Sequence, residues 1–207
     1  MTRFPITNVV GDLVDQHRDP DEKLYASLEL NQVAFPKTGM VVSQIPLGPK
    51  FVPGANNYGV CENGMWVVAD KAAGIIDAPA AATDSPIGIV YTTEKEYDRE
   101  HYGLQRFGRK VAGDYPRVGI LGLGDTVTTN CLQYDTTDFA NDAALWTALE
   151  KDLSVAANAL YVKAVAGSPV PQITKTKPNA GTYAKVVKYY TIPNGGKGVK
   201  YQIVSLG

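Results

Sequence analysis

Two segments near the C-terminus alternate apolar and polar residues in the pattern of a β-hairpin. Residues 183–192 and 198–206 place Val, Ile and Tyr on one side and Lys, Thr and Gln on the other, and the turn-forming run 193–197 (PNGGK) separates them. Successive side chains of a strand point to opposite faces. The pattern therefore predicts a hairpin with one buried and one solvated face, which other elements must cover.

Turn signals recur along the rest of the chain. The sequence holds 20 Gly and 13 Pro in 207 residues, which favours many turns and argues against a helical bundle. Two of these signals predict further β-hairpins: Asn63-Gly64 between 58–62 and 65–69, and Gly124-Asp125 between 117–123 and 126–132. Additional strands are expected over 86–92, 159–166 and 172–177.

One segment has the spacing of an amphipathic helix. Apolar residues recur at three- and four-residue intervals from Leu145 to Leu153, and the alanines between them favour a helix. Asp138 or Asn141 can accept hydrogen bonds from the free amides of its first turn. A helix of about three turns is too short to persist alone, so we expect it to pack on a sheet.

The first 57 residues differ from the rest. A short helix is expected after Pro20, and four prolines punctuate residues 35–58, where each one fixes φ and favours an extended predecessor. We therefore divide the chain into an extended N-terminal arm, residues 1–57, and a β-rich core domain, residues 58–207. The predicted fold is mainly β: an antiparallel β-sandwich or small barrel with one short helix and the N-terminal arm.

Composition narrows the classes of function. Apolar residues make up 44% of the chain and charged residues 20%, which argues against general disorder. The formal net charge of −1 removes the main electrostatic argument for a nucleic-acid or anionic-membrane partner, and we expect neither. No apolar run approaches the length of a membrane span, and the first residues make a poor secretion signal.

The two cysteines, Cys61 and Cys131, form no closely spaced pair and are too few for a four-ligand zinc site. A single disulfide between them is compatible with the sequence. Two buried thiols are the favoured interpretation, because both cysteines lie in strand-like segments, and this fits synthesis in a reducing cytoplasm.

The strongest candidate for chemistry is an acidic stretch near the N-terminus. If this stretch is extended, Asp15, His17 and Asp19 lie on one side of the chain, with Asp21 two residues further on. Carboxylates and imidazoles are ordinary ligands for a divalent cation. A solvated, charged loop explains the same residues more simply, so we expect no metal and no cofactor.

The remaining patterns also favour structural roles. Residues 119–124 are glycine-rich like a dinucleotide-binding loop, but Val127 stands where the third glycine is needed. No GxSxG motif supplies a serine nucleophile for which His101 could act as a base. A catalytic dyad of His101 with Cys61 or Cys131 is disfavoured, because both cysteines lie in strand-like segments where a buried side chain is usual. The carboxylates of residues 94–100 alternate with basic residues, as on a solvated surface. The sequence therefore predicts no catalytic residue and a non-enzymatic protein.

Several segments resemble structural proteins of tailed bacteriophages, above all capsid decoration and other head-associated β proteins. They are the Pro-rich arm segment 35–58, the Ala-Gly-rich stretch 72–76, the strand 86–90, the run 116–127 with its Gly-Asp-x-Val step at 124–127, and the terminal turn 193–199. The resemblance implies a virion component, made in the host cytoplasm, that binds and reinforces an assembled capsid. Its expected partners are the major capsid protein or other virion subunits, and a homo-oligomer such as a trimer.

The arm is the expected place of contact with the capsid, because an extended segment can add a strand to a neighbour or lie in its groove. The residues expected to make this contact are Phe35, Met40, Val41, Ile45, Phe51 and Tyr58.

Three alternatives stay open. A tail, baseplate or connector subunit uses the same kinds of strands. A metal-dependent hydrolase would use Asp15, His17 and Asp19. A host adhesin or carbohydrate-binding module is suggested by the aromatic residues alone.

Overall fold

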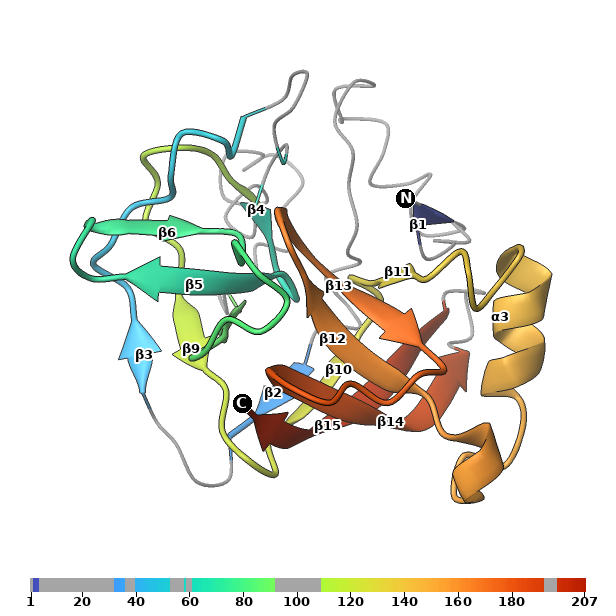
Figure 1. Cartoon of the computed structure of the whole chain (residues 1–207). Coiled ribbons are helices and arrows are strands. Elements are labelled where there is room, and N and C mark those ends of the chain that lie inside the picture. The colour runs from blue at the N-terminus through green and yellow to red at the C-terminus, as the bar shows by residue number, and fades with distance from the viewer. Residues whose placement is uncertain are drawn as a thin grey trace.

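The chain folds as a mainly β protein in a computed structural model. The structure describes residues 2–3, 32–35, 40–52, 58, 61–91, 109–191 and 197–207, with side chains left out at 2–3, 32, 109–110 and 197. Two sheets that are largely antiparallel form a sandwich-like arrangement, as the sequence predicts. In Figure 1 the smaller sheet and helix α3 (Asp142–Leu149) lie at opposite ends of the view, with the larger sheet between them.

In the part of the chain that the structure describes, the larger sheet has eight strands, and all its neighbouring strands are antiparallel except β11 and β13, which are parallel. Its order is β1 (Thr2–Arg3), β11 (Gln133–Tyr134), β13 (Ser168–Thr174), β12 (Tyr161–Val165), β14 (Thr182–Thr191), β15 (Lys197–Leu206), β10 (Thr126–Thr129) and β2 (Gln32–Ala34).

Within the described ranges, the smaller sheet has five antiparallel strands, and two further strands form a separate ladder. The five strands are β3 (Val41–Val42), β9 (Val118–Ile120), β7 (Gly88–Val90), β5 (Trp66–Asp70) and β6 (Ile75–Asp77). The ladder pairs β4 (Cys61–Glu62) with β8 (Arg109–Lys110).

One hydrophobic cluster joins the two sheets and the helix. Val162, Ala184 and Ile203 enter it from the larger sheet, Trp66 enters it from the smaller sheet, and Leu145 enters it from the helix. We call the side of the larger sheet that faces this cluster the inner face. Because the same buried surface serves all three parts, the sheets and the helix stabilise one another.

A polar contact lies inside this cluster. The Trp66 Nε1–H donates a hydrogen bond to the Tyr201 hydroxyl at 2.9 Å, and the two rings meet edge to face with centroids 5.9 Å apart. Both side chains are fully buried. The hydrogen bond gives the two polar groups partners that water cannot supply there.

The C-terminal hairpin is confirmed. β14 and β15 pair from Thr182 with Leu206 to Thr191 with Lys197, and two register shifts interrupt the ladder. Ala184 and Val186 are buried on the inner face, while Lys185 between them is partly exposed. The predicted division into a buried and a solvated face therefore holds over this half of β14.

The predicted helix is confirmed too, and Asn141 is its N-cap. The Asn141 side-chain oxygen accepts a hydrogen bond from the Ala144 N–H at 3.0 Å. Leu145 and Leu149 are buried within the helix, and Leu153 is buried just beyond it. A 3₁₀ turn, η2 (Ala156–Asn158), then leads into β12. No helix in the described part of the chain is long and apolar enough to cross a membrane.

Two of the predicted hairpins are wrong, although their turns exist. The turn at Asn63-Gly64 connects β4 and β5, but β4 pairs with β8, and β5 pairs with β6 and β7. The turn before Asp125 connects β9 in the smaller sheet to β10 in the larger one. The local sequence predicted each turn correctly, but the strand partners are determined by packing with distant segments of the chain.

The turn between β9 and β10 is a corner where the chain changes sheets. Gly124 adopts a positive φ of 91°, which a residue without a side chain accepts readily. The Asp125 carboxylate accepts a hydrogen bond from the Gly122 N–H at 2.7 Å, and its backbone amide donates to the Gly122 carbonyl. These bonds close the corner.

β13 begins earlier than the sequence predicts. Strand was expected over 172–177, with residues 167–169 ending the strand before it, but β13 already starts at Ser168. The ladder with β12 shifts register between the pairs Lys163–Gln172 and Val165–Ser168. Pro169 and Pro171 lie in this irregular part, where a missing N–H disturbs the ladder least.

Candidate partner-binding surfaces

The residues predicted to contact a capsid fall into three groups by exposure. Met40 and Val41 expose 56% and 44% of their surface, whereas Phe51 is fully buried. Phe35, Ile45 and Tyr58 are partly buried. Of the six predicted contact residues, Met40 and Val41 are therefore the two most exposed to a partner.

Phe51 belongs to the core instead of a contact surface. It lies in a second hydrophobic cluster with Leu47 and Val42, and its ring meets that of Tyr58 edge to face at 5.0 Å. Burial of such apolar surface stabilises the fold. The segment 40–52, assigned from the sequence to the arm, therefore packs into the body of the protein.

Tyr58 is held in place by polar contacts as well as by this packing. Burial and a hydrogen bond with the Asp77 side chain raise the pKa of Tyr58 to about 12. The Lys50 ammonium lies 5.8 Å from the centre of the same ring. Tyr58 is therefore engaged in contacts within the protein, which leaves less of its side chain for a partner.

Met40 and Val41 lie at an edge of the smaller sheet. β3 is the first strand in the order of that sheet and pairs with β9 on one side, Val41 with Gly119 and Val42 with Val118. Val42 is buried and Val41 is exposed. The structure therefore presents an edge strand with an apolar outer side, which we call the β3 edge.

A second surface follows from a charge pattern that the net charge of the whole chain does not reveal. Residues 153–207 contain seven lysines and neither Asp nor Glu, so the rest of the chain carries all the acidic residues. The near-zero net charge is thus an average over two parts of opposite sign. A count of charge along the chain would have found this feature.

The register of the larger sheet brings several of these lysines together. Tyr161 pairs with Lys185, and Lys163 pairs with Tyr183, across β12 and β14. Direct partners on antiparallel strands point to the same face. The residues between them, Val162 and Ala184, are buried on the inner face, so these tyrosines and lysines point outward.

The outward rows continue onto β15 and β10. We call this surface the lysine–tyrosine face, and its members are Tyr161, Lys163, Tyr183, Lys185, Lys188, Lys200, Gln202, Thr126 and Thr128. All nine side chains are partly or largely exposed.

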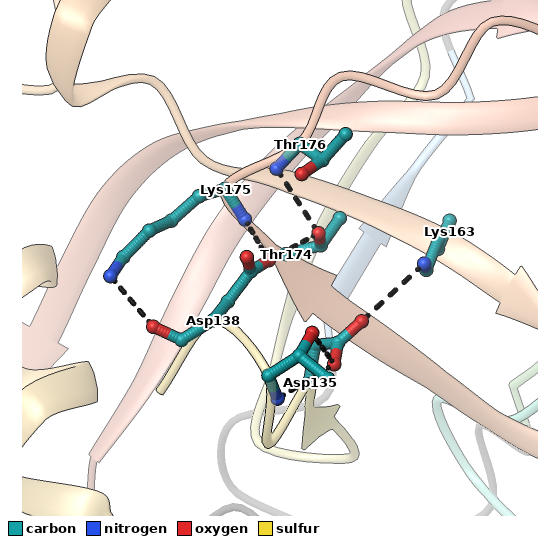
Figure 2. Close-up of polar contacts among 7 residues, drawn as sticks. Asp135, Asp138, Lys163, Thr174, Lys175 and Thr176 are labelled. Carbon is teal, nitrogen blue, oxygen red and sulfur yellow. Dashed lines mark hydrogen bonds and ion pairs between the residues drawn. The ribbon is translucent and has the colours of Figure 1, made fainter. Parts of the chain in front are cut away.

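One carboxylate lies at an end of this face. Asp135 lies 3.6 Å from the Lys163 ammonium, and two hydrogen bonds from Thr137 hold the same carboxylate (Figure 2). The hydrogen bond from the Thr137 hydroxyl is the main cause that lowers the pKa of Asp135. Asp135 therefore stays ionised and faces Lys163.

Asp138 ties the loop before the helix to the end of β13. Its carboxylate accepts hydrogen bonds from the Thr174 hydroxyl and the Lys175 amide, and its carbonyl accepts one from the Lys175 ammonium at 2.7 Å (Figure 2). The Lys175 ammonium also lies 4.7 Å from the centre of the Phe139 ring. This group of contacts serves the structure of the loop.

A shallow hollow of about 210 Å³ adjoins the lysine–tyrosine face at Tyr161. Lys151, Lys175 and Lys177 line it, together with residues 156–160. No acidic side chain is among its lining residues, so the hollow extends the positive surface around the end of β12.

Cys61 and Cys131 form no disulfide with each other, and both are buried. Burial raises the pKa of the Cys131 thiol well above its usual range, and the nearby Glu62 and Cys61 add to the shift. A buried thiol with a raised pKa is a poor nucleophile. The interpretation as two buried thiols is confirmed.

The other candidate sites from the sequence lie outside the described residues. These are Asp15, His17, Asp19 and Asp21, His101, and the carboxylates of residues 94–100. Within the described ranges, no group of three or more His, Cys, Asp and Glu side chains is placed to hold a metal ion. The metal-dependent hydrolase therefore stays an untested alternative.

Comparison of the chain with protein families, curated proteins and solved structures finds no match. The resemblance to phage structural proteins thus stays a prediction, and the two exposed surfaces are the basis for the proposals below.

Proposed function

We propose that the protein is a non-enzymatic structural subunit that binds a larger assembly through the β3 edge. The observation that supports this most directly is the exposure of Met40 and Val41 on an edge strand. The assembly that the sequence resemblance favours is an assembled phage capsid.

An edge strand suits this role for a physical reason. Within the described part of the chain, no strand pairs with the outer backbone N–H and C=O groups of β3, so an extended segment of a partner can pair with them. Apolar side chains at the same edge add buried area when the partner docks. Each contact can be weak, because copies arranged by capsid symmetry act together.

The rest of the smaller sheet fixes the position of β3. β3 is anchored by Val42, which is buried, and by the hydrogen bond from the Ile120 N–H to the Met40 carbonyl at 3.0 Å. The capsid contact is therefore expected to form without a large rearrangement of β3. We also propose a homo-oligomer, for which light scattering of the purified protein gives the mass.

Sedimentation with particles tests the proposal. Particles from cells that produce the chain would be separated on a density gradient, and the chain would be located by electron microscopy with a labelled tag. We expect the wild-type chain on capsids and expect the double variant Met40→Glu/Val41→Glu to be absent from them. Val155→Glu, a similar change at a residue that is 46% exposed near η2, is the control and should stay bound.

Two outcomes would contradict the proposal. Sedimentation with isolated tails would identify a tail, baseplate or connector subunit instead. Binding that survives the double substitution would remove the β3 edge as the contact, even if the chain is found on capsids.

A further inference from the structure

We propose that the lysine–tyrosine face binds single-stranded nucleic acid. This inference is independent of the β3 edge and revises the expectation that nucleic acid is not a partner. That expectation rested on the net charge of the whole chain, whereas all seven lysines of residues 153–207 lie in a part without acidic residues.

The first step is that two lysines face each other across the sheet. Lys188 on β14 and Lys200 on β15 are direct partners in the ladder, and Thr128 on β10 lies opposite Lys200 on the other side. Like charges directly opposite each other destabilise a sheet. The Lys188 ammonium lies 5.0 Å from the centre of the Tyr190 ring on the same strand. A residue pair that weakens its own fold is expected where it serves another purpose, and an anion bound beside Lys188 and Lys200 would relieve the repulsion.

The second step is that further lysines continue from this pair across neighbouring strands. Lys185 lies one outward position away from Lys188 on β14, and Lys163 lies on β12 opposite Tyr183. Adjacent strands are about 4.8 Å apart and outward positions about 6.8 Å apart, so each diagonal step is about 8 Å. Lys163, Lys185 and Lys200 therefore lie on one diagonal. Because the Lys163 ammonium is paired with Asp135, the ammonium groups offered to a chain of phosphates are those of Lys185 and Lys200, together with Lys188.

The third step is the placing of aromatic rings beside this line. Tyr161 and Tyr183 occupy the outward positions that alternate with Lys185 and Lys163, and their rings meet at a centroid distance of 6.2 Å. Both are partly exposed. Single-stranded nucleic acids bind where a positive track carries aromatic side chains on which bases stack, and polar neighbours such as Gln202 and Thr126 can supply hydrogen bonds.

An acidic protein surface is the other partner that would suit a positive face. Lysine is depleted in the centres of protein–protein interfaces, because its hydrated charge and flexible stem are costly to bury. Here lysines occupy central strands of the sheet and alternate with tyrosines. The arrangement favours a polyanion with flat bases over a folded acidic partner.

Fluorescence anisotropy with a labelled oligo(dT) of about 20 nucleotides tests the proposal in low salt, about 50 mM. We expect micromolar binding, with log K falling against log salt at a slope of about −0.7 for each phosphate contacted. The double variant Lys188→Gln/Lys200→Gln should bind at least about ten-fold more weakly, with the slope reduced in magnitude by about 1.4. The matched control Lys50→Gln/Lys71→Gln changes two exposed lysines outside the face and should change affinity less than about two-fold.

A second variant separates stacking from charge. Tyr183→Leu should weaken oligo(dT) binding about five-fold or more, whereas Tyr183→Phe should keep it, because a phenyl ring still stacks. Circular dichroism and thermal unfolding confirm that each variant is folded. Absence of oligo(dT) binding at low salt would overturn the proposal. So would equal binding of poly-L-glutamate together with no effect of Tyr183→Leu, which would identify an acidic protein as the partner.

Discussion

At the scale of single residues, a hydrogen bond between two buried polar groups fixes the positions of the side chains that carry them. Tyr201 and Trp66 come from different sheets, and their hydrogen bond lies between the two. Burial raises the pKa of Tyr201 far above its usual range, so its hydroxyl stays protonated and its oxygen stays available to accept the Trp66 N–H. The bond therefore helps to fix one sheet against the other.

Tyr201→Phe should lower the free energy of unfolding by about 1–3 kcal/mol, because it leaves the buried Trp66 N–H without an acceptor. Tyr190→Phe, which removes a hydroxyl from a partly exposed ring, should change it by less than about 0.5 kcal/mol. Urea unfolding measures both. Equal effects of the two substitutions would show that the buried hydrogen bond has no special weight.

Tyr58 makes stability depend on alkaline pH. Its pKa rises from 10.0 to about 12 on folding, mainly through burial and then through Asp77. The folded state thus keeps a proton that the unfolded state loses above pH 10, so this stabilisation is complete below pH 10 and is lost as the pH rises towards 12.

We therefore expect the urea midpoint of the wild-type protein to fall between pH 10 and pH 12, and expect the fall to be smaller for Tyr58→Phe. The absorbance of tyrosinate, titrated in both proteins, gives the ionisation of Tyr58 by difference. An ionisation at pH 10, unchanged from a free tyrosine, would contradict the assigned environment.

At the scale of elements, a loop from the smaller sheet meets the ends of the C-terminal hairpin. The Ser85 hydroxyl donates a hydrogen bond to the Leu206 carbonyl at 2.6 Å. Gly181, at the start of β14, has a φ of 80°, and a side chain there would come within 2.7 Å of the Ala82 carbonyl oxygen. The absence of a side chain at Gly181 is what permits this approach.

Gly181→Ala should therefore destabilise the protein more than Gly113→Ala. Gly113 also has a positive φ, 87°, but nothing lies within 4 Å of the position of its missing side chain. Backbone strain alone should cost about 1–2 kcal/mol at Gly113, and the steric conflict should add about 1–3 kcal/mol at Gly181. Denaturant unfolding measures the difference, and equal losses would mean that the loop yields freely.

At the scale of the whole molecule, the segment 40–52 belongs to the folded body. Leu47 and Phe51 lie in a cluster that also contains Met65 of the β4–β5 turn and Val118 of β9. A cut after residue 57 would remove Phe51 from this cluster and β3 from its sheet. Such a truncated chain should not fold as the intact one does, so point substitutions test capsid binding better than deletions.

Phe51→Ala should lower the free energy of unfolding by about 3–5 kcal/mol, because it leaves a cavity in a fully buried cluster. Met40→Ala, at a side chain that is 56% exposed, should change it by less than about 0.5 kcal/mol. Thermal or urea unfolding of the two variants gives the comparison. A small effect of Phe51→Ala would return residues 40–52 to the role of a detachable arm.

The sequence alone was sufficient where a local rule sets the structure. The alternation in 183–192 and 198–206 predicted the hairpin and its outward lysines, and Asn141 was one of two predicted caps for the helix. The turns at Asn63-Gly64 and Gly124-Asp125 also follow from their own residues. These features depend on neighbours in the chain, whose spacing the sequence states directly.

Only the tertiary structure decided which strands pair and which surfaces stay open. β9 and β10 join different sheets because their partners come from distant segments, and Phe51 is buried in a cluster whose members range from Val42 to Val170. The lysine–tyrosine face exists because β12, β14, β15 and β10 align their outward rows, and sequence periodicity fixes the face of a residue but not its neighbours across the sheet. Long-range packing selects those neighbours, because the burial of apolar surface stabilises the complete set of strand pairings together.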